Sequence, residues 1–220
     1  MADNTILEPI FENVPSEFFR QLIENTDAAF STATLLSHHY IKEPEQANIL
    51  GQLRHALCEK GFRDAAHAHG LHVSSPHTNP PGGRYSLVEG NGIIFVRANN
   101  QKDCGPPRPT KFRRQWASCN QYLEPLQFNL LENTGSLPSN KLCAMIVTTA
   151  HSLKSGNGDP SVPAWIGLGI PYSDLSNWKL LKSIPEILSL YHDRDTAASR
   201  KTLIEPAEIK DTAIPRLKPR

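Results

Sequence analysis

A run of basic side chains lies between positions 97 and 114, and two aromatic residues interleave with it. The run holds six Lys or Arg residues against one acidic residue, Asp103. Guanidinium and ammonium groups bind phosphate oxygens, and an aromatic ring offers a surface on which a base can stack. The segment therefore predicts contact with nucleic acid or with a protein partner, through Arg97, Lys102, Arg108, Lys111, Phe112, Arg113, Arg114 and Trp116.

The same segment has a second interpretation. Phe112 and Trp116 would then be anchors in a hydrophobic core, because large aromatic side chains are mostly buried. The charges would belong to a solvated loop that is paired with acidic residues elsewhere, an arrangement that contributes little to stability. The sequence leaves both interpretations open.

Histidine is concentrated between positions 67 and 77, with Asp64 three positions before His67. Imidazole and carboxylate groups are metal ligands, so Asp64, His67, His69 and His72 form an alternative site for a metal-dependent nuclease or phosphoesterase, such as a toxin. No HExxH motif and no histidine–glutamate motif followed by C-x-x-C accompanies them. We therefore favour exposed or structural histidines, and expect no metal and no cofactor.

Motifs for nucleophilic catalysis and phosphate binding are missing from the sequence. It contains no G-x-S-x-G motif and no P-loop. His72-Val73-Ser74 has the form of one half of a two-histidine phosphoesterase signature, but the second half is absent. These absences favour a protein that is not an enzyme.

The overall composition does not indicate a class of binding partner. The 23 Lys and Arg residues nearly balance 22 Asp and Glu residues, so the net charge of +1 provides no long-range field. No window approaches about 18 consecutive apolar residues, and the first residues, Met1 to Asn4, do not have the pattern of a secretory signal. The four cysteines form no C-x-x-C pair. We expect a cytoplasmic protein with no membrane contact, and self-association into a homo-oligomer is left open.

Hydrophobic periodicity predicts the elements. Helical spacing follows Ser16 and again follows Glu45, and the residues around Gly90-Asn91-Gly92 are typical of a β-hairpin. Apolar runs predict neighbouring strands at 142–149 and 164–170, and helical spacing returns at 113–123 and 176–191.

These elements predict an α+β fold in which N-terminal helices precede a mainly antiparallel sheet of about four strands with packed helices. We expect a helical arm at 1–42, an α+β domain at 43–195 and a polar, basic, flexible tail at 196–220.

Three segments carry a resemblance to known proteins: residues 84–97, residues 106–121 and residues 163–172. Through them, the stretch from about residue 50 to about residue 190 resembles small uncharacterised bacterial proteins encoded beside helix-turn-helix regulators in mobile-element or phage-defence loci. The resemblance implies a regulatory or interaction protein of a bacterial defence or toxin–antitoxin-like locus, and it implies no catalytic residues.

Overall fold

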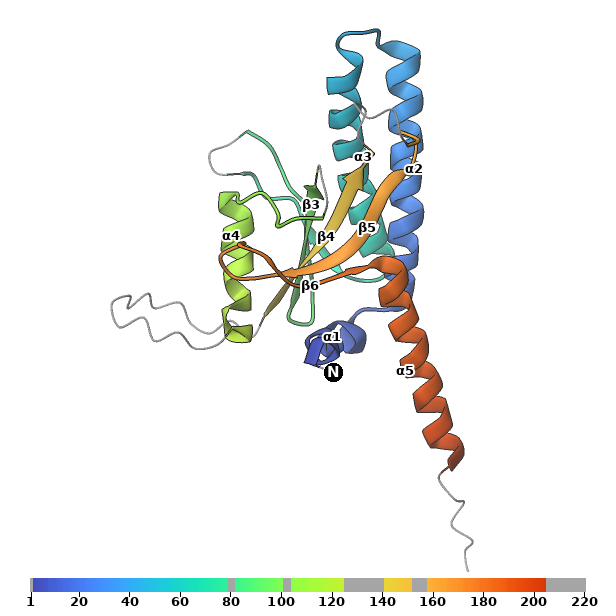
Figure 1. Ribbon diagram of the computed structural model, residues 1–220, viewed down its shortest axis with the longest axis vertical. Coiled ribbons are helices and arrows are strands. Elements are labelled where there is room, and N and C mark those ends of the chain that lie inside the picture. Colours follow the sequence, from blue (N-terminus) through green and yellow to red (C-terminus); the bar gives the residue numbers. More distant parts are fainter. Residues whose placement is uncertain (1, 79–81, 101–103, 125–140, 152–157, 205–220) are drawn as a thin grey trace, which may run out of the picture.

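A six-stranded mixed sheet forms the middle of the structure (Figure 1), a computed structural model that describes residues 2–78, 82–100, 104–124, 141–151 and 158–204. The strands lie side by side in chain order, and every neighbouring pair is antiparallel except β3 and β4, which are parallel. Their bounds are β1 His72–Ser74, β2 Leu87–Gly90, β3 Ile93–Asn100, β4 Leu142–Ala150, β5 Pro163–Pro171 and β6 Trp178–Ser183.

The α+β class is confirmed, but the expectation of about four mainly antiparallel strands is wrong, because the sheet has six strands and is mixed. Parallel strands need a long crossover connection that carries chain from one end of the sheet to the other. The chain between Asn100 and Lys141 supplies this connection, and the helical segment within it covers one face of the sheet. Periodicity within single strands does not reveal such a crossover.

The predicted hairpin is confirmed as the β2–β3 pair. Asn91 and Gly92 form its turn with φ of 45° and 83°. Positive φ at both central residues matches a type I′ turn, whose twist fits the flanking strands. The turn sets the register, so that Leu87 pairs with Val96 and Gly90 with Ile93.

Helices cover both faces of the sheet, and side-chain alternation in β3 shows which residues face which layer. Ile93 and Phe95 pack in one core with helices α1 (Ala2–Asn13), α2 (Ser16–Tyr40), α3 (Gln46–Ala68) and α5 (Ile184–Ile204). Ile94 and Val96 pack in a second core with α4 (Lys111–Ala117) and the 3-10 helix η1 (Ser118–Leu123). Helices α2 and α3 run side by side, and α4 lies on the other side of the sheet (Figure 1).

The helices at both ends of the described chain pack against the sheet or against each other. Leu7, Phe18 and Phe19, within the expected arm at 1–42, are buried in the same core as the sheet. The Tyr191 hydroxyl of α5 donates a hydrogen bond to the Val14 carbonyl at 2.6 Å. Helix α5 continues to residue 204, and the rest of the expected tail, residues 205–220, lies outside the described residues. None of the helices in the described ranges is long and apolar enough to cross a lipid bilayer.

The boundary between β6 and α5 differs from the prediction. Residues 178–183 form an edge strand, where helical spacing predicted a helix, because Leu180 and Leu181 pair with Ile170 and Gly169 of β5. Ser183 and Glu186 then start α5 with a capping box: the Glu186 carboxylate accepts the Ser183 N–H at 2.7 Å, and the Glu186 N–H donates to the Ser183 hydroxyl at 3.3 Å.

We expect Glu186→Gln to lower the free energy of unfolding by about 1 kcal/mol, because the charged cap of α5 is lost. Hydrogen bonds from the Ser183 hydroxyl and N–H lower the pKa of Glu186 below its ordinary value. The carboxylate therefore stabilises the fold above its unfolded pKa of about 4.3, and this contribution is lost as pH falls through the folded pKa. Urea unfolding at pH 7 and at about pH 3 measures the difference between the two proteins.

Ser189→Ala, at an exposed position of the same helix, is the control. It is expected to shift the unfolding midpoint slightly upward and by the same amount at both pH values, because alanine favours the helix and carries no charge. A Glu186→Gln deficit of the same size at both pH values would contradict the electrostatic cap.

Candidate functional site: a buried polar cluster and the basic face beside it

A buried polar cluster lies where helix α3 crosses the parallel strands β3 and β4. We define it by Glu59 of α3, Ser86 just before β2, Arg97 of β3 and Thr148 of β4, all of which are buried. Charged groups are almost never buried without a partner, because burial removes their hydration. The hydrogen bonds of this cluster therefore show how the surrounding elements are held.

Glu59 and Arg97 form the charged centre of the polar cluster. Arg97 Nη1 lies 3.4 Å from Glu59 Oε1, and the other carboxylate oxygen, Oε2, accepts the backbone N–H of Ser86 at 2.9 Å. Arg97 Nη2 donates to Thr148 Oγ1 at 3.3 Å and to Asn99 Oδ1 at 3.0 Å. The side chains of Glu59 and Arg97 are only 10% and 3% exposed, so little water screens this pair.

The local sequence explains why both charges point inward. Arg97 follows Ile93 and Phe95 at strand period, so all three side chains face the same layer. Glu59 precedes Phe62 and Ala66 by three and seven positions on α3, which is helical spacing for one face. The strand period of β3 and the helical period of α3 therefore place the Arg97 guanidinium and the Glu59 carboxylate together, between the sheet and the helix.

The polar cluster has the chemistry of a structural support. The Ser86 hydroxyl accepts a hydrogen bond from Arg63 Nη1 at 2.9 Å, and no histidine of the described chain lies in hydrogen-bond contact with that hydroxyl to act as its base. The Cys58 thiol lies beside the polar cluster, and burial raises its pKa, although the nearby Arg97 guanidinium opposes the shift. A protonated thiol is a poor nucleophile.

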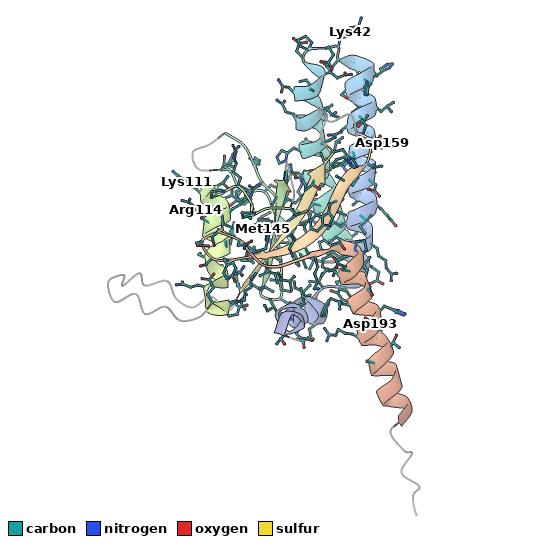
Figure 2. The ribbon with its side chains drawn as sticks, viewed as in Figure 1. Lys42, Lys111, Arg114, Met145, Asp159 and Asp193 are labelled. Carbon is teal, nitrogen blue, oxygen red and sulfur yellow. The ribbon has the colours of Figure 1, made fainter. Side chains whose placement is uncertain are left out.

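The exposed cations lie on the other side of the sheet, on α4 and in the loop before it. Arg108, Lys111 and Arg114 are exposed, and Figure 2 labels Lys111 and Arg114 on α4. None of the ion pairs within the described ranges involves these three residues. We call these residues the basic face. They have the accessibility that phosphate contact requires.

The other residues of the predicted binding segment do not belong to the basic face. Arg97 is buried in its ion pair with Glu59, and Lys102 lies outside the described residues. Phe112 stacks on Tyr85, with ring centroids 4.2 Å apart and planes 18° apart. Trp116 packs in the second core and its Nε1 donates to the Tyr85 hydroxyl at 3.4 Å. Both aromatic residues are thus partly buried and contact Tyr85 of the same chain.

Arg113 connects the basic face to β3. Its Nη1 donates to the Arg108 carbonyl at 3.0 Å and its Nη2 to the Arg97 carbonyl at 3.5 Å. Burial lowers the pKa of its guanidinium, and the Glu59 carboxylate raises it. Arg113 is therefore used to position the loop that carries Arg108, rather than to bind an external anion.

The alternative metal ligands are not gathered into a site. Asp64 pairs with Lys60, His69 Nε2 lies 2.9 Å from Gln21 Oε1, and His72 Nδ1 lies 4.0 Å from a Glu89 carboxylate oxygen. Across the described ranges, no group of three or more His, Cys, Asp or Glu side chains is placed to hold a metal ion.

Sequence reasoning missed Glu59, Ser86 and Thr148. The available signal was the helical spacing from Arg54 through Cys58 to Phe62, which marks the buried side of α3 and places Glu59 next to it. The helical spacing after Glu45 that predicted this helix runs through Ile49, Leu50, Leu53, Ala56 and Leu57. Of these, Leu50 is buried and Ala56 is exposed. Comparisons with protein-family models, curated proteins and solved structures found no match to this chain.

We expect Glu59→Gln to lower the free energy of unfolding by about 3–5 kcal/mol, because the Arg97 guanidinium is left buried without its counter-ion. Urea unfolding monitored by tryptophan fluorescence measures this change. The double variant Glu59→Gln/Arg97→Met is expected to recover part of the loss, since it removes the unpaired charge along with its partner.

Asp64→Asn is the matched control on the same helix, because it removes the exposed Lys60–Asp64 ion pair. We expect a change below about 1 kcal/mol there. If Glu59→Gln and Asp64→Asn lowered the free energy of unfolding equally, the buried Glu59–Arg97 pair would contribute no more to stability than an exposed ion pair.

Proposed function

We propose that this chain is a non-enzymatic regulatory protein of the bacterial cytoplasm that binds nucleic acid through its basic face. The observation that carries the proposal is a local charge imbalance. Residues 104–123 contain four basic side chains and no acidic one, and three of the four, Arg108, Lys111 and Arg114, are exposed. Phosphate contacts supply most of the affinity in non-specific nucleic-acid binding, so exposed, unpaired cations are what such binding requires.

The spacing of the cations on α4 fits a phosphate backbone. Lys111 and Arg114 are three positions apart on one helix, which places their Cβ atoms about 5–6 Å apart. Phosphates follow one strand of a duplex about every 3.4 Å along its axis. The two side chains therefore reach phosphates one or two nucleotides apart, and Arg108 extends the contact beyond the start of the helix.

The basic face is supported from behind before any ligand binds. The Phe112–Tyr85 stack and the Trp116–Tyr85 hydrogen bond hold α4 on the sheet, and Arg113 holds the preceding loop through the Arg108 carbonyl. A support that is already ordered reduces the conformational entropy lost on binding. The resemblance of the sequence to proteins encoded beside helix-turn-helix regulators agrees with a regulatory role.

Three cations predict a modest, salt-dependent affinity. We expect the logarithm of the association constant to fall with the logarithm of salt concentration with a slope of about −2 to −3, since each neutralised phosphate contributes about −0.7 to −0.9. Lys111→Gln/Arg114→Gln is expected to reduce the slope to about −1. Fluorescence anisotropy with labelled DNA and RNA at about 50 to 200 mM salt measures both values.

The control variant is Arg20→Gln/Lys42→Gln, which removes two exposed cations from α2 and the turn after it, away from α4 (Figure 2 labels Lys42). Its slope is expected to equal that of the original protein. Absence of salt-sensitive binding to every probe would overturn the nucleic-acid proposal and assign the basic face to an acidic protein surface instead.

A further inference from the structure

We propose that Tyr122 stacks on an unpaired base, so that single-stranded nucleic acid is the form the basic face selects; this rests on the proposed function above. Tyr122 belongs to η1, which follows α4 without interruption, and it is 52% exposed. An exposed ring is unusual among the aromatic residues of this region, since Phe112 and Trp116 are partly buried and each contacts Tyr85.

Tyr122 ends a continuous exposed stripe along α4 and η1. The stripe follows helical spacing, with cations first, then neutral polar side chains, then the exposed ring. Its members are Lys111, Arg114, Gln115, Ser118, Gln121 and Tyr122. With rises of about 1.5 Å per residue in α4 and about 2.0 Å in η1, the stripe is about 18 Å long, which is enough for several nucleotides of an extended strand.

The backbone around Tyr122 is fastened to the sheet. The Asn120 side chain donates to the Cys143 and Pro171 carbonyls and accepts the Cys143 N–H, all at 2.8–2.9 Å. Glu124 accepts a hydrogen bond from the Ser173 hydroxyl at 3.0 Å, and Lys179 donates to the Leu123 carbonyl. Tyr122 thus presents an exposed ring on a fastened backbone. Little conformational entropy is lost when such a ring binds a ligand.

The form of the ligand follows from the chemistry of a stacking ring. Bases in a duplex already stack on their neighbours, whereas an unpaired base has a free π-face, and every base type has one. A tyrosine hydroxyl has an ordinary pKa of about 10, so the Tyr122 ring carries no negative charge near phosphates at pH 7. Partial burial and the nearby Cys119 raise this pKa further. In a single strand, the phosphates can contact the cations at one end of the stripe while an unpaired base stacks on the neutral ring at the other end.

Anisotropy titrations with labelled single strands of about 12 nucleotides, one of oligo-dT and one of oligo-U, and with a duplex of equal length test the proposal. We expect tighter binding to the single strands. Tyr122→Ala is expected to weaken single-strand binding by roughly 5- to 150-fold with little change in the salt slope. Tyr122→Phe is expected to bind like the original protein, and Tyr122→Leu, which retains apolar volume without a π-face, like Tyr122→Ala.

Tyr40→Ala is the matched control, because Tyr40 is 71% exposed on α2, far from α4 in the fold. Its binding is expected to be unchanged. Unchanged single-strand binding by Tyr122→Leu, or equal affinity for duplex and single strands, would overturn the role of Tyr122 while salt-sensitive binding still supported the proposed function. Failure of all three probes to bind would overturn both proposals. A preference between oligo-dT and oligo-U would identify DNA or RNA as the source of the strand.

Discussion

The carboxylate of Glu59 joins three parts of the chain: helix α3, strand β3 and the segment before β2. It reaches from α3 to the side chain of Arg97 in β3 and to the backbone N–H of Ser86 before β2. Arg97 in turn reaches Thr148 in β4, and its carbonyl accepts a hydrogen bond from Arg113 of α4. A buried charge is tolerated only when its partners are in place, so the Glu59–Arg97 pair constrains the position of α3 relative to β3 and to the segment before β2.

The segment from Arg97 to Arg114 shows one residue type in two roles. Arg97 and Arg113 are turned inward, where Arg97 pairs with a carboxylate and Arg113 donates hydrogen bonds to two carbonyls. Arg108 and Arg114 are turned outward and form none of the ion pairs found in the described chain. The two inward guanidiniums hold β3 and the loop before α4, and the side chains of Arg108 and Arg114 remain exposed to solvent. Counting the charges of the segment therefore overestimates the ones available for binding.

Features that depend on residues close together in the sequence could be predicted from it. The hairpin at Gly90-Asn91-Gly92 was predictable because two neighbouring residues with positive φ determine it. The S-x-x-E spacing of Ser183 and Glu186 was an equally local signal for the start of α5, and it outweighs the helical spacing of the apolar residues before it.

The parallel β3–β4 pairing and the burial of Arg97 depend on contacts between distant segments, which no local pattern contains. The basic residues form a cluster in the sequence, but their division into buried and exposed residues could be seen only in the fold. The exposure of Tyr122 could not be predicted for the same reason, since an isolated tyrosine in a sequence does not indicate whether its ring is buried.

The parallel β3–β4 pair also bears on the order in which the chain folds. The β2–β3 hairpin closes over a two-residue turn and joins neighbours in sequence, whereas β4 pairs with β3 only after the whole segment between Asn100 and Lys141 has been synthesised and turned back. Non-local pairing of this kind is slow, because the entropy of loop closure must be lost before any contact is gained. Helix α4 and η1 lie within that segment and dock on β4 through Asn120 and Cys143. The surface they carry therefore becomes ordered only once β4 is in place, so it depends on the strand pairing that joins the most distant segments among the strands described.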